Sequence, residues 1–260
     1  MMRQHWAEVI GEALTHAEAS LNSLEEVLLL HKTEKAISAF LAGINRGAGS
    51  LKVLRSFLCG TYCSIRIQGA QSLHAFVRGG KVPSLKELTV NLAGIGQEGM
   101  QAFAAALSTS HASALRRLEV KFGGVGPADA AAEVELFSVA LSSGYLRRLG
   151  ELSVGGLGMI GEVQVLCMGL GSGELTSLRK IQLTGVGFRK EGGRDLSEVL
   201  IVEKLPSLRS LDAKWAGLTG EGLRALAGGW MTRTPPPLKH LNLKCTKLTG
   251  GVADALSTLL

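Results

Sequence analysis

The sequence has few aromatic residues and no long run of apolar residues. Aromatic residues make up 5% of its 260 positions, and no segment stays apolar over the roughly 20 residues that a membrane-spanning helix needs. The N-terminal stretch MMRQHWAEVIGEALTH has acidic residues within its apolar part, which secretory signals do not have. These absences predict a protein that is not in a membrane and that lies in the cytoplasm or the nucleus.

The sequence also lacks the residue groupings that metal sites and catalytic sites need. Of the cysteines Cys59, Cys63, Cys167 and Cys245, only the first two are close together, and no second pair or histidine stands at metal-ligand spacing. The histidines are scattered, and no nucleophile can be grouped with a base and an orienting acid. We therefore predict reduced thiols, no metal ion, no cofactor and no enzymatic activity.

One glycine motif resembles a dinucleotide-binding loop. Gly156, Gly158 and Gly161 have the G-x-G-x-x-G spacing and lie between an expected strand and an expected helix. A dinucleotide site needs an acid at the end of the following strand to hold the ribose, but that strand ends in Thr184 and Gly185. The motif is also in phase with a repeat, so we interpret it as a repeat loop.

What the sequence does contain is a pattern L-x-x-L-x-L that returns about every 30 residues. The starting leucines of the copies are Leu24, Leu51, Leu85, Leu115, Leu149, Leu178, Leu208 and Leu238. Apolar positions alternate as in a strand, and most units then have an apolar pair at helical spacing, such as Phe103 and Leu107. The longer units fit when a short insertion is placed between strand and helix. A period of this length predicts a solenoid.

The repeat predicts the architecture of the solenoid. Strand, loop, helix and loop in about 30 residues form a crossover unit, whose successive strands are parallel and whose hand is right. Strands lie about 4.8 Å apart while helices are about 10 Å wide, so the stack must curve toward the strands. We predict an α/β fold: a curved right-handed βα horseshoe arc with a parallel sheet on its concave face and helices on its convex face.

Two details of the units lead to local expectations. Gly99, Gly192 and Gly222 recur at or just before the expected helix starts, where glycine would allow tight turns. Ser56 and Ala213 stand where the third apolar residue of the strand should be. We therefore expect the second and seventh units to be less firmly packed.

The pattern is clearest in LRSLDAKWAGLTGEGLRALAGG from Leu208 and in LKHLNLKCTKLTGGVADALSTLL from Leu238. With it, the chain from Leu24 to Leu260 resembles the leucine-rich repeat family, and specifically its ribonuclease-inhibitor-like subtype. That resemblance implies a scaffold for protein-protein interaction. The family also includes small-GTPase regulators resembling Ran GTPase-activating proteins, and sensor or adaptor regions of multidomain receptors or ubiquitin-ligase subunits, and both alternatives stay open.

The chain departs from the family pattern in the turn after each strand. The family usually has asparagine or cysteine eight residues after the first leucine, where the side chain bonds to the backbone of the turn. This chain has other residues in that column, namely Ala93, Gly123, Leu157, Val186, Ala216 and Thr246. We therefore expect side-chain bonding in the turns to be largely missing.

The concave face is where we expect a protein partner to bind, because alternate residues of each strand point away from the core. The predicted partner-binding residues are Arg117, Glu119, Lys121, Phe122, Lys180, Gln182, Asp212, Lys214, Trp215, His240, Asn242 and Lys244. Lys121-Phe122 and Lys214-Trp215 occupy equivalent places and would set a cation beside a large ring, as protein hot spots do. Alternatively, both rings fold into the adjoining loop as core. A GTPase regulator would need Asn91 or Asn242 against the nucleotide.

A second column is basic, since a lysine or arginine follows the first leucine in most units. Its members are Lys52, Lys86, Arg116, Arg179, Arg209 and Lys239. The column either faces an acidic partner or forms a solvated rim. The net charge is only +6, and no basic cluster is dense enough to predict nucleic-acid binding.

The two ends differ from the repeats. Residues 1–23, with Trp6, Ile10 and Leu14 at helical spacing, predict an amphipathic helix that covers the first strand as a cap, before the array of about eight units at 24–260. The other end stops at Leu260 on the last expected helix, without a polar terminal unit. Solenoids need such caps, so we expect this end to pack on further repeats or on a partner.

Overall fold

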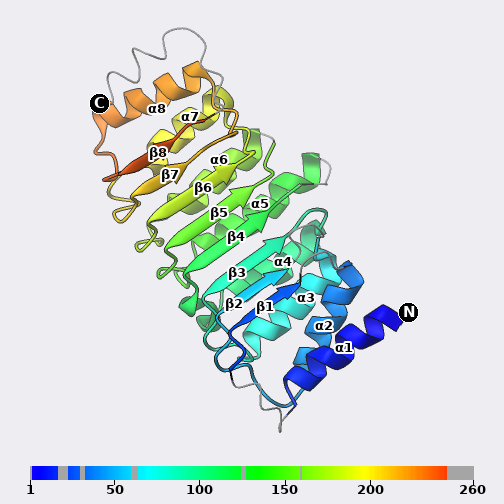
Figure 1. The fold of residues 1–260 in the computed structure, drawn as a ribbon. Coiled ribbons are helices and arrows are strands. Elements are labelled where there is room, and N and C mark those ends of the chain that lie inside the picture. Colours follow the sequence, from blue (N-terminus) through cyan, green and yellow to red (C-terminus); the bar gives the residue numbers. More distant parts are fainter. Residues whose placement is uncertain are drawn as a thin grey trace. The chain divides into compact units, whose positions relative to one another are not determined.

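The computed structural model of the chain describes residues 2–16, 23–29, 33–59, 64–123, 127–158 and 160–244. The chain divides into two compact units, Met1–Val125 and Gly126–Leu260, here called unit 1 and unit 2. Strands and helices alternate along each of them (Figure 1).

In the described residues of unit 1, four strands pair in chain order, all parallel. Its elements are α1 (Met2–Leu14), β1 (Glu26–Leu29), α2 (Glu34–Arg46), β2 (Ser56–Cys59), α3 (Arg66–Arg78), β3 (Glu87–Asn91), α4 (Gly96–Leu107), a short 3-10 helix (Ser110–Ala114) and β4 (Arg117–Lys121). The register places Val27, Phe57, Leu88 and Leu118 in one row across the strands.

Unit 2 repeats this arrangement with four more parallel strands. Its elements are α5 (Pro127–Leu141), β5 (Glu151–Gly155), α6 (Ile160–Leu170), β6 (Lys180–Thr184), α7 (Arg189–Val199), β7 (Ser210–Asp212), α8 (Gly220–Thr232) and β8 (His240–Asn242). Leu152, Ile181, Leu211 and Leu241 form the matching apolar row.

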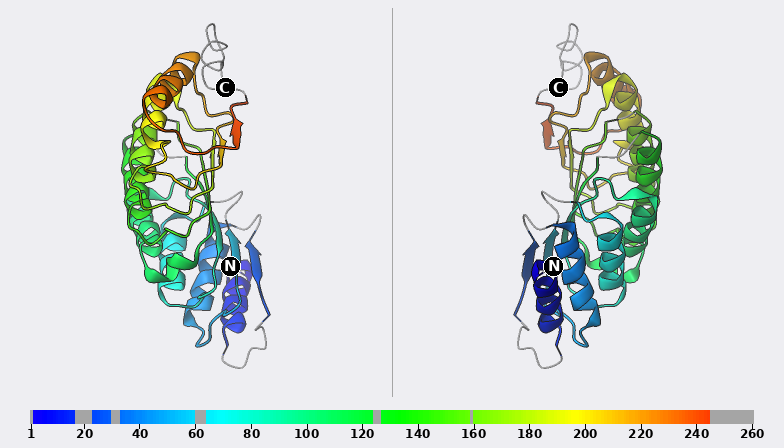
Figure 2. Two further views of the ribbon diagram at one scale, coloured as in Figure 1. Left: turned by 90° about the vertical axis from the view of Figure 1, so that its left-hand side faces the viewer. Right: turned by 90° about the vertical axis from the view of Figure 1, so that its right-hand side faces the viewer.

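In each unit the helices cover one face of the strands and leave the other face open (Figure 2). The alternation of the sequence explains this layering. In β5, for example, Leu152 and Val154 point toward the helices and are buried, whereas Glu151 and Ser153 point to the open face and stay partly exposed. The parallel strands and their intervening helices confirm the predicted α/β repeat architecture.

The apolar pairs predicted on the helices form the other half of each core. Phe103 and Leu107 of α4 are buried, and so are Leu196 of α7 and Leu200 directly after it. In α8, where the second place is a tryptophan, the Trp230 Nε1 group donates to the carbonyl of Leu200 at 2.9 Å. The indole thus satisfies its polar atom by bonding to the neighbouring repeat.

The register corrects the predicted start of the second repeat. Leu54, and not Leu51, aligns with Leu85, because Ser56 pairs with Glu87 and Phe57 pairs with Leu88. Both neighbouring intervals then come close to the common length of about 30 residues. Ser56 lies at an outward position, and the buried Cys59 fills the third apolar place. The prediction of a weakened strand at Ser56 was therefore wrong.

The recurring glycines have a different role from the one predicted. Gly99, Gly192 and Gly222 lie inside the first turns of α4, α7 and α8 and do not have a positive φ. A Cβ added at Gly222 would lie 2.3 Å from the carbonyl oxygen of Arg189, and one at Gly99 would lie 2.6 Å from Ile95 Cγ1. These glycines are needed because neighbouring parts of the chain approach closely.

The N-terminal helix forms as α1, but its apolar stripe does not face β1. The helix lies against α2, where a Cβ on Gly11 would lie 2.1 Å from the carbonyl oxygen of Phe40. Trp6 and Ile10, which were expected to cover the first strand, are 62% and 51% exposed. That part of the prediction was wrong, and the role of the helix as a cap stays a prediction.

The predicted last helix, including Leu260, lies outside the described residues. Leu241, the last described member of the apolar row in unit 2, is 38% exposed, whereas Leu211 in the preceding strand is 1% exposed.

Candidate interaction surface

On unit 1, the predicted residues of β4 lie side by side with the outward residues of β3. Arg117, Glu119 and Lys121 pair in register with Glu87, Thr89 and Asn91. Nη2 of Arg117 lies 3.9 Å from Oε2 of Glu119, which places both side chains on the same face, as residues two apart in a strand must be. The open face here is polar and has both signs of charge.

On unit 2, the register arranges five of the predicted residues, together with Ser210, in two rows across three strands. One row consists of Lys180, Ser210 and His240, and the other consists of Gln182, Asp212 and Asn242. These side chains are partly exposed on β6 and β7 and exposed on β8. The structure thus brings together the six residues on a face that can donate and accept hydrogen bonds. Their use by a partner remains a prediction.

Side chains bond to the backbone in the turns, against the expectation from the sequence. Oδ1 of Asp212 accepts from the Lys214 amide at 3.1 Å, and Oδ1 of Asn242 accepts from the Lys244 amide at 3.1 Å. In unit 1, Oδ1 of Asn91 accepts from the Ala93 amide at 3.0 Å. The residue that ends the strand therefore does what the family's asparagine does further along the turn.

The two lysine-ring pairs have different structures although they occupy equivalent places in the sequence. Phe122 is 7% exposed and belongs to the core of unit 1, so the prediction that its ring is available to a partner was wrong. Trp215, three residues after the end of β7, is 62% exposed. The alternative that the ring folds into the core thus holds for Phe122 and fails for Trp215. Lys121 and Lys244 are exposed, and Lys214 is partly exposed.

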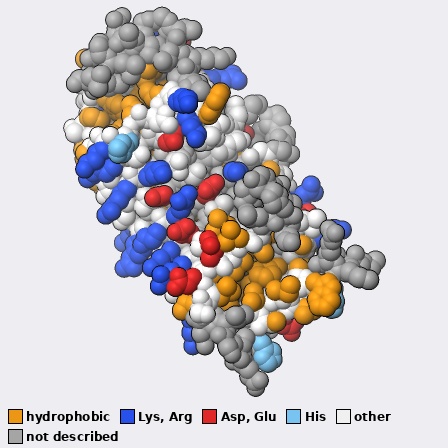
Figure 3. All heavy atoms as spheres, viewed as in Figure 1, with side chains coloured by type: hydrophobic (Ala, Val, Ile, Leu, Met, Phe, Trp, Pro, Cys, Tyr) orange, Lys and Arg blue, Asp and Glu red, His pale blue; other side chains and the backbone are white. Residues whose placement is uncertain are grey.

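Most members of the basic column directly precede a strand, namely Lys86, Arg116, Arg179, Arg209 and Lys239. Figure 3 shows Lys and Arg side chains gathered on the face in view. The corrected register places Arg55, and not Lys52, beside Lys86, because the amide of Lys86 donates to the carbonyl of Arg55. Two column members donate to loop carbonyls of their own unit: Nη1 of Arg116 bonds to Ala114 at 2.9 Å, and Nη1 of Arg209 bonds to Leu208 at 3.1 Å. These bonds favour the rim interpretation for the two arginines.

The buried thiols have environments that suppress their reactivity. Burial raises the pKa of the Cys59 thiol to about 12. Burial also raises the pKa of Cys167, with repulsion from Asp195 and Glu198 adding to it. Because the thiolate is the nucleophile and the metal ligand, neither group is suited to catalysis or metal binding. Cys63 and Cys245 lie outside the described residues, and the described part of the chain contains no group of three His, Cys, Asp or Glu residues that could hold a metal ion.

The glycine loop after β5 already holds a carboxylate of the protein. Oε2 of Glu162, in the first turn of α6, accepts from the amide of Gly158 at 2.8 Å. Phosphates bind such loops through free amides at a helix N-terminus. The buried Glu162 side chain places negative charge there, which favours the interpretation of this motif as a repeat loop.

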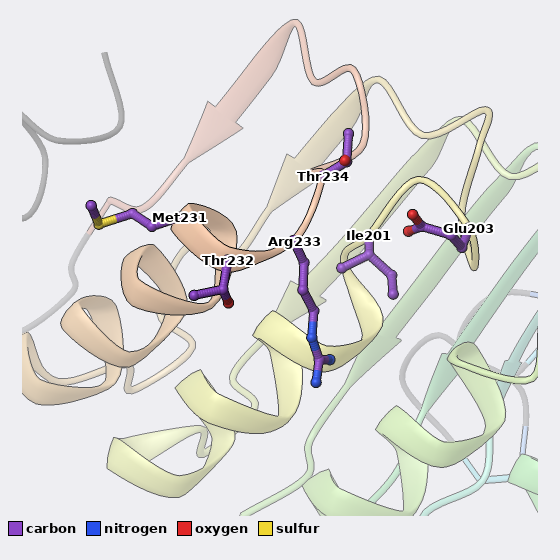
Figure 4. A pocket seen from close by; sticks show the side chains of 6 residues that line it. All are labelled: Ile201, Glu203, Met231, Thr232, Arg233 and Thr234. Carbon is purple, nitrogen blue, oxygen red and sulfur yellow. The ribbon is translucent and has the colours of Figure 1, made fainter.

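A hollow of about 570 Å³ lies near the end of α8. It is lined by Ile201, Glu203, Met231, Thr232, Arg233 and Thr234. The side chains of Met231, Arg233 and Glu203 point in different directions and do not converge on a common point (Figure 4). A catalytic or ligand site needs convergent polar groups, so this hollow does not form a candidate site.

One of three comparisons with known proteins agrees with the repeat. A family model described as "Leucine Rich repeat" matches residues 83–104 and 204–227. The comparison with curated proteins finds no match. Among solved structures, an internalin from Listeria monocytogenes has 13% identity to this chain, and the likeness covers 97% of this chain and 92% of that chain. Its TM-score is 0.23, which is too low to support an argument.

No helix in the described residues is long and apolar enough to cross a membrane.

The two matched segments contain β3 with the first part of α4, and β7 with the first part of α8. The same alternation of strand and helix occurs before and between them, and β8 follows the second segment. Each unit therefore has an α/β fold of strand-helix repeats, and each contains one segment that matches the leucine-rich repeat model.

Proposed function

We propose that the chain is a non-catalytic scaffold that binds another protein through the open face of its strands. The observation that carries this proposal is the arrangement of polar side chains in rows on a face that no described helix covers. In unit 2, Gln182, Asp212 and Asn242 form such a row. Side chains held on a sheet change little in position on binding, so less conformational entropy is lost than when a flexible loop binds.

The size of the face suits a protein partner. A stable interface buries about 800 Å² on each partner, which is more than a small ligand requires. Within each unit, side chains from adjacent strands are available at once, such as Thr89 and Glu119 in unit 1, or Lys180 and Ser210 in unit 2. The described cysteines, Cys59 and Cys167, are free thiols, which agrees with a location in the cytoplasm or the nucleus. We also propose that the repeats are of the ribonuclease-inhibitor-like subtype, because they are long and have α-helices between their strands.

The proposal is tested with two charge variants and a matched control. The sheet variant combines Lys180→Glu with Gln182→Glu on the open face, and the control is Arg224→Glu, which changes an exposed cation on α8. Affinity capture with quantitative mass spectrometry, followed by Kd measurement on the purified partner, compares both with the wild type. We expect the sheet variant to weaken partner binding about tenfold or more and the control to leave it unchanged. If only the α8 variant loses the partner, the helix face is the binding surface and the proposal is wrong.

A further inference from the structure

The turns after the strands of unit 2 share a conformation that favours glycine. Gly156, Gly185 and Trp215 occupy one column, because Gly155 pairs with Thr184 and Gln182 pairs with Asp212. Their φ angles are 79°, 67° and 57°, all in the left-handed region. Glycine adopts this region freely, whereas a side chain brings Cβ too close to the following carbonyl. Trp215 therefore stands in a strained conformation where two neighbouring repeats have glycine.

The fold does not compensate this strain by burying the ring. Trp215 is 62% exposed, and its indole forms no hydrogen bond or ring contact with a described residue. Its backbone amide does bond to the carbonyl of Lys244 at 3.0 Å, but any residue other than proline could make that bond. Large aromatic side chains that remain exposed at such cost are found where they contact something outside the chain.

Three cationic residues lie near Trp215, one next to it in the chain and two through backbone hydrogen bonds. Lys214 directly precedes Trp215 in the chain. The carbonyl of Lys244 accepts a hydrogen bond from the Trp215 amide. Arg189, the first residue of α7, also has a positive φ of 47° and donates its amide to the carbonyl of Gly217, two residues beyond Trp215. We call Arg189, Lys214, Trp215 and Lys244 the Trp215 cluster.

The cations of the Trp215 cluster are not neutralised by the described part of the chain. None of the three forms an ion pair with a described residue, and the nearby Glu221 pairs instead with Lys190, at 3.5 Å between Oε2 and Nζ. A carboxylate of a partner could therefore form ion pairs with these cations without first breaking an ion pair within the described part of the chain. Arg189 is not among the residues predicted from the sequence, because its left-handed backbone is visible only in the structure.

We propose that the Trp215 cluster is a docking site for an acidic protein segment that carries an apolar side chain. The apolar side chain packs on the indole ring, which is the kind of anchor that dominates interface energy, and the acidic residues meet Arg189, Lys214 and Lys244. This inference rests on the proposed function and names the chemistry of the partner. A single exposed ring favours a peptide over single-stranded nucleic acid, which stacks successive bases on several rings.

The test uses the full chain and four labelled probes whose binding is measured by fluorescence anisotropy. The first probe is a 12-residue peptide that alternates Glu with Leu and Phe. In the second, Lys replaces Glu; in the third, Ser replaces Leu and Phe; the fourth is a 12-nucleotide single-stranded DNA. We expect the first peptide to bind about tenfold tighter than each of the others, and we expect added salt to weaken its binding.

The variants Trp215→Gly and Trp215→Ala separate a docking role from a structural role. Both should weaken binding of the first peptide about tenfold or more, because the anchor is lost. Trp215→Gly should at the same time unfold at a higher denaturant concentration than the wild type, because it removes the left-handed strain. A tryptophan that stabilises the fold would give the opposite shift. Gly185→Ala is the matched control, since it changes the same column without touching the cluster, and it should leave binding unchanged.

Three results would overturn the inference: unchanged peptide binding by Trp215→Gly, a lower unfolding midpoint for Trp215→Gly, or tighter binding of the DNA than of the first peptide. If Trp215→Gly keeps its protein partner and the Lys180→Glu with Gln182→Glu variant loses it, the proposed function stands and only the docking site is wrong. If the variant on the open face keeps the partner and Trp215→Gly loses it, the docking site stands and the open face is not the main binding surface.

Discussion

The two units use the same repeat, but they treat the residue seven places after the first leucine in opposite ways. In unit 1 that residue is buried, as Leu92 and Phe122 show. In unit 2 it has a left-handed backbone, and the next residue is the buried one, as in Leu157, Val186 and Ala216. A difference of one place in the turn thus decides whether an aromatic ring becomes core or surface. Equivalent positions in a repeat sequence therefore need not be equivalent in exposure.

Truncation of the buried ring and of the exposed ring should change the stability of the fold by very different amounts. Phe122→Ala should lower the free energy of unfolding by about 3–5 kcal/mol, because it leaves a cavity in the core of unit 1. Trp215→Ala should change it by no more than about 0.5 kcal/mol, because an exposed ring contributes little to folding. Denaturant unfolding of both variants measures the difference. Similar losses for the two would mean that the rings are equally buried and that the contrast between the units is wrong.

The sequence predicts the core of this fold well, because the core depends on periodicity alone. Strands and helices follow from the spacing of residues such as Leu88 and Val90, or Phe103 and Leu107, which all proved buried. The start of the second repeat failed because Leu51 and Leu54 both fit the first place of the pattern, and only the pairing of Ser56 with Glu87 decides between them. Local apolar spacing does not determine strand register when a leucine is available at both places.

The candidate site could be predicted only in part. Alternation along a strand placed Lys180, Gln182 and Asp212 on the open face. The contrast between Phe122 and Trp215 depends on backbone torsions, which residue type indicates only indirectly. A signal was nevertheless present, since Gly156 and Gly185 stand in the column of Trp215, and recurring glycine in a turn indicates a left-handed conformation.

The helix layer is where the units agree, and the next prediction tests that agreement. A Cβ at Gly222 in unit 2 would meet the backbone carbonyl of Arg189, and a Cβ at Gly99 in unit 1 would meet Ile95. Gly222→Ala should lower the free energy of unfolding by about 1–3 kcal/mol. Gly99→Ala should lower it less, because its tightest contact is a side chain and its nearest backbone atom, Ile67 Cα, lies further away at 3.1 Å.

Gly228 of α8 is the matched control for the helix layer, since a Cβ there would meet nothing within 4 Å. Gly228→Ala should raise the free energy of unfolding by about 0.5–1 kcal/mol, because alanine loses less conformational freedom than glycine in a helix. Thermal and denaturant unfolding measure all three variants. A neutral Gly222→Ala would show that the close approach of α7 and α8 can relax without cost.

Each unit buries one described thiol, and this predicts a shared loss of stability at alkaline pH. The folded state raises the pKa of Cys59 from 9.0 to about 12, so the thiol keeps its proton while the unfolded chain releases it. The stabilisation is complete below pH 9 and is lost as the pH rises from 9 toward 12. At pH 10 the loss should be on the order of 1 kcal/mol for this thiol.

The variant Cys59→Ala isolates the contribution of the thiol. Its free energy of unfolding is expected to be lower at neutral pH, because the alanine leaves a small cavity, yet it should fall less steeply between pH 8 and pH 10 than that of the wild type. Urea unfolding across this pH range measures both slopes. Equal slopes would show that the thiol titrates alike in the folded and unfolded chains.

Two glycine variants measure the cost of the left-handed backbone conformation that distinguishes the turns of unit 2 from those of unit 1. Gly185 has a positive φ and open space around a prospective Cβ, so Gly185→Ala can lose stability only through the left-handed backbone, by about 1 kcal/mol. Gly158 has the same open space without a positive φ, and Gly158→Ala should therefore not lower stability. The difference in unfolding midpoint between these two variants measures the strain that Trp215 also carries. If both variants unfold at the same denaturant concentration as the wild type, the left-handed turn has no cost in stability. The exposure of Trp215 would then be no evidence for a partner.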